Sequence, residues 1–355
     1  MSERPLTPEE RLKAAEGPLL AWYGSRARAL PWREEPSPYR VWISEIMLQQ
    51  TRVEAVKPYF QRFLQVFPDV ETLAGAEEEL LMKQWEGLGY YSRARNLQAA
   101  AKKIMEEYGG EIPDSRDELL TLPGIGSYTA GAIASIAYGV PEPAVDGNVL
   151  RVISRLLGER WDITKAAVKK QVEELVAGVM PAREASSYNQ SLIETGALVC
   201  VPGGEPHCAE CPLEALCMTR KEGLWKEIPY KPPKKPRRIE ERTLFLIEWE
   251  GKTAIAKRPD TGLLASMYEL PGCEGFLSRE EAAKWLGAPE KAEALEELPR
   301  AKHIFSHVEW HMIAYRLRLS SEGEIRLPEG AFLAKEEELR SVYPLPGAFQ
   351  AYRNG

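Results

Sequence analysis

The 355-residue chain has few cysteines, few histidines and no long hydrophobic run. No apolar stretch approaches the roughly 20 residues that a membrane-spanning helix needs, so we expect no membrane segment. The first twenty residues, MSERPLTPEERLKAAEGPLL, contain neither an apolar core region nor a cleavage site, so we expect no signal peptide. Without a secretory context, disulfide bonds are not expected to stabilise the fold.

The scarce cysteines are concentrated in one place. Four of the five lie within eighteen residues, in the pattern C-x7-C-x2-C-x5-C, and they are Cys200, Cys208, Cys211 and Cys217. Four thiolates suit either an iron–sulfur cluster or a structural zinc ion. Zinc sites usually contain two CxxC pairs, and this segment contains one, which favours a cluster but leaves zinc open.

The sequence also lacks the excess of positive charge that would by itself indicate a nucleic-acid partner, because its net charge is −7. Residues 218–242 are an exception, with nine Lys and Arg against four Asp and Glu. Within this segment, KPPKKPRR (231–238) is rich in proline, which predicts an extended, semi-rigid connector. It is either a solvated linker or a linker that also contacts phosphates.

The length favours two domains. Residues 1–219 are predicted to form a mostly α-helical domain, 220–241 the basic linker, and 242–355 an α+β domain. The second domain begins with TLFLIEWEGKTAIAKR, in which two β-rich runs flank Glu250–Gly251 and so predict a β-hairpin.

Two glycines mark a tight turn at Leu122-Pro123-Gly124-Ile125-Gly126. Gly124 and Gly126 permit positive φ, and the next helix is predicted to begin near Ser127 and to continue to Tyr138. The unpaired amides at the start of a helix suit a phosphate. The alternative is a simple packing corner between two helices.

Two acidic residues are candidates for catalysis. Asp146 precedes a helical segment, where it is predicted to be the N-cap and to be favoured in its ionised form by the helix dipole and free amides. Glu45 lies among apolar residues, so burial is expected to raise its pKa. One protonated and one ionised carboxyl suit cleavage of a glycosidic bond. The alternatives are a structural N-cap and a glutamate on the polar face of a helix.

These motifs resemble those of a known family. LPGIGSYTAGAI (122–133), the later aspartate and the four cysteines are similar to the helix-hairpin-helix DNA glycosylases of the endonuclease III superfamily. LPWR (30–33), SEIMLQQTRV (44–53), WEGLGYYSRARNL (85–97), PAVDGNVLRV (143–152) and FSH (305–307) resemble the MutY-type adenine DNA glycosylases. The resemblance covers nearly the whole chain. It implies a monomeric, cytoplasmic and nucleoid-associated enzyme that removes adenine paired with oxoguanine or guanine in double-stranded DNA.

The resemblance also implies residue roles. Glu45 would protonate adenine N7, Asp146 would stabilise the oxocarbenium ion, and Tyr128 and Asn148 would flank the sugar. The implied adenine pocket consists of Arg28, Leu30, Trp32, Arg33, Leu48, Val53 and Gln190. The implied oxoguanine contacts are Gln50, Thr51, Tyr90, Phe305, Ser306 and His307, and Leu88 is a further implied substrate-binding residue. The implied phosphate hairpin is Leu122, Gly124, Ile125 and Gly126, with a monovalent cation, or calcium in crystals, on the carbonyls of Leu120, Leu122 and Ile125.

Three departures from the family pattern lead to further expectations. Tyr128 stands where bifunctional relatives have a lysine, so a monofunctional enzyme without strand cleavage is predicted. Seven residues rather than six separate the first two cysteines, and Gly203-Gly204 can absorb the extra one, so a [4Fe-4S] cluster is still predicted. His207 is an alternative ligand. The C-terminal domain resembles a Nudix domain, since TGLLASMYELPGCEG (261–275) is similar to its beginning, but the acidic RExxEExG box is absent, which predicts recognition without hydrolysis.

Other interpretations remain open at the sequence level. His303, His307 and His311 recur every four residues, as on a metal-binding helix face, but the alternation of AKHIFSHVEWHM is more typical of a strand. The chain could also be a glycosylase for another base, such as an oxidised pyrimidine. A non-catalytic DNA-binding protein is the remaining alternative, and it would not need the paired acids.

Overall fold

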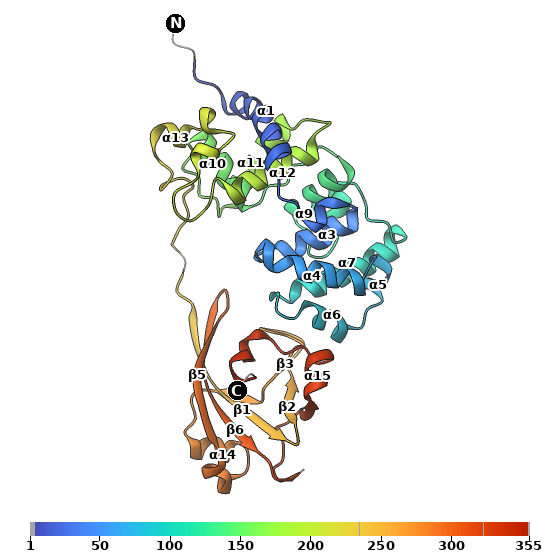
Figure 1. Cartoon of the computed structure of the whole chain (residues 1–355), viewed down its shortest axis with the longest axis vertical. Helices are drawn as coiled ribbons and strands as arrows, with labels where there is room; N and C mark the ends of the chain where they lie inside the picture. Colours follow the sequence, from blue (N-terminus) through green and yellow to red (C-terminus); the bar gives the residue numbers. More distant parts are fainter. Residues whose placement is uncertain (1–3, 234, 322, 354–355) are drawn as a thin grey trace. The chain divides into compact units, whose positions relative to one another are not determined.

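The computed structural model describes residues 4–233, 235–321 and 323–353. The chain forms two compact units (Figure 1). The first comprises Met1–Gly75 and Arg95–Pro233, and the second comprises Ala76–Ala94 and Lys234–Gly355. No helix among the described residues is both long enough and apolar enough to cross a membrane.

The first unit is helical. Its elements are α1 (Pro8–Arg26), α2 (Pro31–Glu34), α3 (Pro38–Leu48), α4 (Val53–Val66), α5 (Val70–Ala74), most of α7 (Ser92–Tyr108), α8 (Arg116–Leu119), α9 (Ser127–Ala132), the π-helix η1 (Ile133–Ala137), α10 (Gly147–Leu157), α11 (Ala166–Val179), α12 (Ala185–Leu198), the short 3-10 helices η2 (Cys208–Glu210) and η3 (Glu214–Leu216), and α13 (Met218–Glu222). The described residues of 231–237 belong to no helix or strand.

Local signals explain where several helices begin and end. Thr7 and Glu10 form a capping box at the start of α1, in which each side chain bonds the other residue's backbone N–H. Asp146 caps α10, and Gly158, with φ of 77°, ends it. The apolar face of α10 packs with α1, α11 and α12 around residues such as Leu19 and Ile153, and this core fixes the direction of α10.

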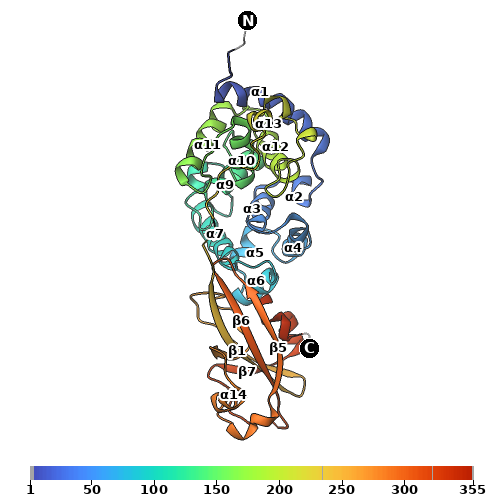
Figure 2. The ribbon, with the colours of Figure 1, turned by 90° about the vertical axis from the view of Figure 1, so that its left-hand side faces the viewer.

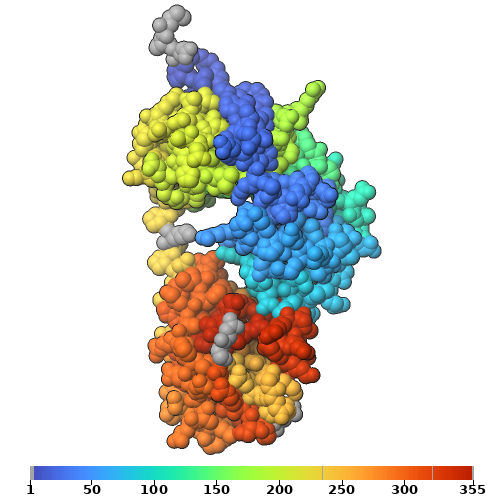
Figure 3. Space-filling view, viewed as in Figure 1, coloured from blue at the N-terminus to red at the C-terminus, as the bar shows by residue number. Residues whose placement is uncertain are grey.

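Helix α1 lies against segments that are far away in the sequence (Figure 3). The buried guanidinium of Arg11 donates a hydrogen bond to the carbonyl oxygen of Leu216 at 2.5 Å. Leu216 directly precedes Cys217, so α1 is joined to the cysteine segment. The first helix of this unit is therefore in contact with the cysteine segment near the unit's C-terminal end.

The glycine turn joins α8 to α9. Gly124 has φ of 77°, and a Cβ there would lie 2.7 Å from the Cβ of Asn96, so the turn requires glycine. Gly126 does not use the positive φ that glycine permits: its φ of −99° and ψ of 180° are extended, as is usual for the N-cap residue of a helix, here α9. The helix begins at Ser127 as predicted, then continues as a π-helix to Ala137.

The second unit contains a seven-stranded mixed sheet in the order β3-β2-β1-β6-β5, with β4 paired to β1 and β7 to β2. Figure 2 shows β6 between β1 and β5. Only the β1–β6 pair is parallel among the described strands. The elements are α6 (Glu78–Trp85), β1 (Arg238–Trp249), β2 (Lys252–Lys257), β3 (Tyr268–Glu269), β4 (Gly272–Glu274), α14 (Arg279–Trp285), η4 (Pro289–Ala294), β5 (Glu296–Ile304), β6 (Val308–Arg318), β7 (Ala331–Lys335), α15 (Glu336–Ser341) and η5 (Gly347–Tyr352).

Successive side chains on β1 and β6 point to opposite faces of the sheet, and each face has its own hydrophobic core. Leu244 and Trp310 face α15 and η5, whereas Phe245 and Ile313 face α14, so the sheet is covered on both sides. The predicted hairpin is confirmed, since β1 and β2 pair across Glu250 and Gly251, whose φ values are 45° and 73°.

The strand interpretation of the histidine-rich run is also confirmed. His303 lies on β5 and His311 lies on β6, and residues 305–307 form the connection between these two antiparallel strands. In addition, no group of three His, Cys, Asp or Glu residues within the described ranges is placed to hold a single metal ion. The histidine spacing therefore reflects two strands and not one face of a helix.

Candidate active site

Glu45 is a buried acid at the centre of the candidate site. It lies on α3, and only 8% of its surface is exposed. Burial raises its pKa to about 7, while the hydroxyl of Tyr128, which donates to Oε2 at 2.6 Å, acts in the opposite direction. Asp146 raises this pKa further and Arg33 lowers it. The predicted burial of Glu45 is confirmed, and such a carboxyl can hold a proton near neutral pH.

Asp146 is the second acid, and it interacts electrostatically with both Glu45 and Tyr128. As predicted, it is the N-cap of α10: its Oδ1 accepts from the backbone N–H groups of Asn148 and Val149, both at 2.8 Å. Its Oδ2 accepts from the Asn148 side chain at 2.7 Å. The expected lowering of its pKa is wrong, because burial raises the pKa and outweighs these three donors.

Arg151 fixes the orientation of Asn148, and it was not among the residues predicted from the sequence. Its Nη2 donates to Asn148 Oδ1 at 2.9 Å and to the carbonyl of Gly196 at 2.7 Å, and its Nε donates to the carbonyl of Cys200 at 2.6 Å. With Oδ1 occupied, the Asn148 amide directs its N–H toward Asp146. The signal in the sequence is weak: Arg151 lies three residues after Asn148, on the same face of α10.

Close backbone packing places Asp146 against α9. A Cβ at Gly131 would lie 2.0 Å from the carbonyl oxygen of Pro143, so the segment leading to Asp146 lies directly on the helix that carries Tyr128. Asn189 supports the same segment, because its side chain accepts from the backbone N–H of Ala144 at 3.1 Å and donates to the carbonyl of Glu142 at 2.8 Å. The contact between α9 and the segment before Asp146 therefore holds both Asp146 and Tyr128 in place.

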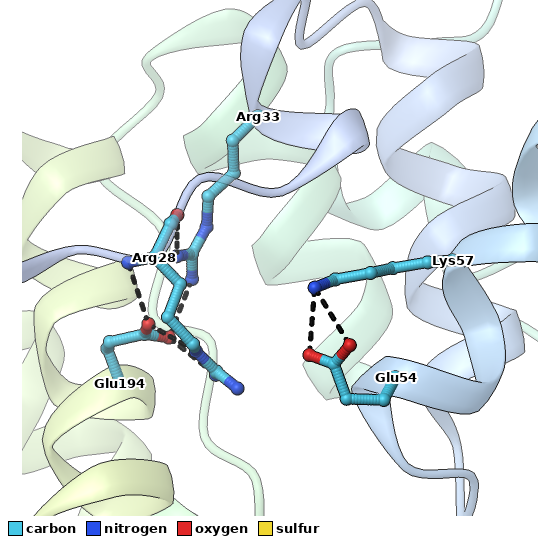
Figure 4. A network of polar contacts seen from close by, with 5 residues as sticks. All are labelled: Arg28, Arg33, Glu54, Lys57 and Glu194. Atoms are coloured by element: carbon cyan, nitrogen blue, oxygen red, sulfur yellow. Dashed lines mark hydrogen bonds and ion pairs between the residues drawn. The ribbon is translucent and has the colours of Figure 1, made fainter.

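Arg28 and Arg33 share a buried partner, Glu194 (Figure 4). Glu194 Oε1 accepts from the backbone N–H and Nε of Arg28 at 3.2 and 2.6 Å. Its Oε2 accepts from Arg28 Nη2 at 2.8 Å and from Arg33 Nη2 at 2.9 Å. Burial alone would raise the pKa of Glu194, but these hydrogen bonds outweigh it and lower the pKa to about 2. Glu194 was also not predicted from the sequence.

The other residues of the implied adenine pocket vary in exposure. Leu30 and Trp32 are buried, and the Trp32 ring meets Phe60 edge-on with centroids 5.5 Å apart. Leu48, Val53 and Gln190 are half-buried. Gln190 donates to Ser186 Oγ at 3.1 Å and lies four residues before Glu194 on α12. Among the predicted catalytic and adenine-pocket residues, side-chain hydrogen bonds join Arg33 to the Arg28 carbonyl, Tyr128 to Glu45, and Asn148 to Asp146.

Residues expected near the opposite base are found in both units. Gln50 belongs to the first unit and Tyr90 to the second, and both are exposed with positive φ, 59° and 49°. A positive φ costs on the order of 1 kcal/mol in a non-glycine residue and is typical of functional sites. Thr51 is half-buried, and Leu88 is buried.

The FSH motif lies at the turn between β5 and β6. Phe305 packs edge-on against Trp310, with centroids 4.9 Å apart, and Ser306 and His307 are exposed. The Ser306 hydroxyl lies 3.3 Å from His307 Nδ1. Phe305 therefore anchors the turn and leaves two polar side chains on its surface.

The glycine turn presents an open surface. Leu122 and Ile125 are buried, and the Ile125 N–H donates to the Leu122 carbonyl at 3.2 Å, so one of the three carbonyls implied for a cation already has a partner. Leu120 is 39% exposed. Apart from Gly126 and its two chain neighbours, no residue has an atom within 4 Å of a Cβ built on Gly126, so a ligand can approach the backbone there.

The four cysteines surround one cavity of about 130 Å³. None of the four is in a disulfide bond. Four thiolates around one cavity are a donor set that suits an iron–sulfur cluster or a zinc ion. Burial raises the pKa of Cys211 to about 12, so its thiolate needs a cationic group. His207 is exposed and does not line the cavity, and Gly204, with φ of 82°, turns the longer loop.

Each of the two domains matches a known protein family. Residues 43–177 match the HhH-GPD superfamily base excision DNA repair protein, and residues 243–354 match the NUDIX domain. Two solved structures are similar in fold. A thermostable thymine-DNA glycosylase is 28% identical with a TM-score of 0.55, covering 60% of this chain and 97% of that one. Endonuclease III trapped covalently on DNA is 29% identical with a TM-score of 0.54, covering 62% and 99%.

The relatives in sequence extend over most of the chain. The human adenine DNA glycosylase is 33% identical, covering 93% of this chain and 71% of that protein, and the mouse enzyme is 35% identical, covering 88% and 72%. The adenine DNA glycosylase of Buchnera aphidicola from Schizaphis graminum is 32% identical, covering 85% and 87%. The predicted fold class is confirmed, and the chain belongs to the adenine DNA glycosylase family, with an endonuclease III-like helical domain followed by a Nudix-like domain.

Proposed function

We propose that this protein is a monofunctional DNA glycosylase that removes adenine paired with oxoguanine or guanine and leaves an abasic site. The observation that carries the proposal is the group of Glu45, Tyr128 and Asp146, in which two buried acids interact and one has a pKa of about 7. Membership of the adenine DNA glycosylase family supports the choice of base.

The two acids divide the chemistry between them. Adenine is unreachable inside the duplex, so it must first be flipped out, at a cost of a few kcal/mol that a mispair lowers. Glu45 transfers its proton to adenine N7, and the C1′–N9 bond breaks with its electrons moving to the base. The ionised Asp146 stabilises the oxocarbenium ion at C1′, and water adds to C1′ and loses a proton. Asn148 holds Asp146 in place for this role.

Tyr128 determines what happens after the base is released. It donates its hydroxyl hydrogen bond to Glu45 and supplies no amine. A strand break by β-elimination would require an amine that forms a Schiff base with C1′, and the position that would carry it is occupied by the phenol. The expected product is an intact strand with an abasic site.

The remaining predicted residues complete the proposal as contacts with DNA. Arg28, Leu30, Trp32, Arg33, Leu48, Val53 and Gln190 would form the adenine pocket. Gln50, Thr51, Tyr90, Phe305, Ser306 and His307 would read the opposite base, and Leu88 would be a further substrate-binding residue. Leu122, Gly124, Ile125 and Gly126 would hold a phosphate, with a monovalent cation on the hairpin carbonyls. The functional division is 1–219, 220–241 and 242–355, in a monomer that acts on DNA in the nucleoid.

We also propose one [4Fe-4S] cluster on Cys200, Cys208, Cys211 and Cys217. The cavity that they line supports this assignment. When bound, the cluster supplies a cationic core that stabilises buried thiolates. The surrounding residues tie this segment to the active-site helix, because Arg155 on α10 donates to Cys200 Sγ at 3.3 Å and to the carbonyl of Val201 at 3.1 Å.

The test is a single-turnover assay on a duplex with one central adenine opposite oxoguanine, developed with and without alkali. We expect strand breaks at adenine only after alkali. Breaks without alkali would reveal a lyase and contradict the role given to Tyr128. Breaks only on duplexes with oxidised pyrimidines would indicate another target base, and binding without any breaks would favour a non-catalytic protein.

A further inference from the structure

Glu194 is a buried ionised residue that the proposed chemistry does not use. Its side chain is wholly inaccessible to solvent, and its four hydrogen bonds come from Arg28 and Arg33. The Nη1 of Arg33 also donates to the carbonyl oxygen of Arg28 at 3.2 Å. The three residues come from α2, α12 and the segment between α1 and α2, so Glu194 holds two distant parts of the chain together.

Arg33 has a second acid within electrostatic reach. The groups that act on Glu45 are Tyr128 from α9, Asp146 at the start of α10, and Arg33 from α2. In the described part of the chain the ion pair that Arg33 makes is with Glu194 and not with Glu45. Because an unpaired buried charge is unfavourable, an Arg33 released from Glu194 would be drawn to another nearby carboxylate.

Resting on the proposed function, we propose that Glu194 is a positioning residue that holds Arg33 and Arg28 in place and so prevents Arg33 from pairing with Glu45. An Arg33–Glu45 ion pair would stabilise the Glu45 carboxylate and leave less of the protonated acid that base release requires. The arginine can then serve the base pocket without disabling the acid beside it.

The test compares the pH dependence of single-turnover base release in the full-length protein and two variants. Glu194→Gln removes the anchoring charge. Glu54→Gln is the matched control, since Glu54 also acts electrostatically on Arg28 but is 77% exposed and bonds Lys57 (Figure 4). We expect the midpoint of the high-pH decline to move to lower pH in Glu194→Gln and to stay in place in Glu54→Gln.

The size and shape of the effect distinguish positioning from a general structural defect. Above the midpoint, the rate should fall about tenfold for each unit by which the Glu45 pKa drops. Well below the midpoint, the rate should stay within a few-fold of wild type. An unmoved midpoint, or equal loss at every pH, would overturn the proposal, as would an equal shift in Glu54→Gln.

Two further measurements keep the proposal testable. If Glu194→Gln does not fold, Glu194→Asp retracts the carboxylate by one methylene and should give a smaller shift in the same direction; a folded Asp variant with an unmoved midpoint overturns it. The Glu45 carboxyl can also be titrated directly by NMR with ¹³C-labelled glutamate, assigned with Glu45→Gln. A wild-type protein without base release would reject the proposed function, and the titration would still decide the role of Glu194.

Discussion

At the scale of single residues, Glu45 and Glu194 are both buried glutamates, yet their pKa values move in opposite directions. Glu45 has a neutral phenol as its hydrogen-bond partner, so burial dominates and raises its pKa to about 7. Glu194 has two guanidinium partners, and they overcome the same penalty and lower its pKa to about 2. The partner, and not the residue type or the burial, decides which glutamate can donate a proton.

Replacing Glu45 by Gln should strongly slow base release and stabilise the protein above neutral pH. Loss of general acid catalysis is expected to slow the reaction about 10²–10⁴-fold. Because the folded pKa is raised from 4.5 to about 7, the stability that the protonated acid confers is present below pH 4.5 and is lost as pH rises through about 7. Glu45→Gln should therefore raise the free energy of unfolding near pH 8 by up to about 3 kcal/mol.

Urea unfolding near pH 4.5 and near pH 8 checks this expectation, with the exposed Glu54→Gln as the control. The gain should be present at the higher pH and absent at the lower one. A Glu45→Gln protein that is less stable at both values would show that the carboxyl contributes structurally and not as a strained acid.

Asp146→Asn should separate catalysis from capping. Asparagine also caps helices well, so the unfolding free energy should change by less than about 1 kcal/mol. Base release should be lost, because a neutral amide cannot stabilise the oxocarbenium ion. Binding to a duplex with adenine opposite oxoguanine, measured by fluorescence anisotropy, should remain within a few-fold of wild type. Loss of binding together with stability would instead support the structural N-cap as the main role.

At the scale of elements, the contact between α9 and the segment before Asp146 fixes the geometry of the site. Gly131→Ala would place a Cβ 2.0 Å from the carbonyl oxygen of Pro143, and a backbone atom cannot move aside as a flexible side chain can. We expect a loss of about 2–4 kcal/mol of stability and a large loss of base release, since Asp146 would be displaced.

Gly178→Ala is the matched control for this change. Gly178 lies in the last turn of α11, and no atom outside its chain neighbours and its own helix backbone lies within 4 Å of the position that a Cβ would take there, so alanine should stabilise the protein by about 0.5–1 kcal/mol through helix propensity. Thermal unfolding and single-turnover rates would measure both variants. Wild-type activity in Gly131→Ala would mean that the segment tolerates displacement.

Elements whose signals lie close together in the sequence were predictable. The N-cap at Asp146 precedes its helix directly, and the Glu250–Gly251 turn lies between its two strands. Glu194 was not predictable, because its arginine partners lie 166 and 161 positions away. The raised pKa of Asp146 was missed for a related reason: the cap is a local signal, whereas burial depends on how distant helices pack.

At the scale of the whole molecule, the two units divide the proposed task. The acids belong to the first unit, and the exposed Ser306 and His307 belong to the second, on a turn that Phe305 anchors to Trp310. A pocket for a normal base cannot by itself reject adenine in A·T pairs, so the opposite base must be read separately. Substitutions that change the selectivity for the opposite base should then differ from those that change the rate of base release.

Replacing Ser306 and His307 together by alanine should remove the preference for oxoguanine without impairing the chemistry. Both side chains are exposed and Phe305 still anchors the turn, so the unfolding free energy should change by less than about 0.5 kcal/mol. The single-turnover rate on adenine opposite oxoguanine should fall toward the rate on adenine opposite guanine, and the latter should stay unchanged. Ser321→Ala, in another exposed part of the same unit, is the control. Equal losses on both duplexes would place these residues in general DNA binding, because only contacts specific to oxoguanine can change the ratio of the two rates.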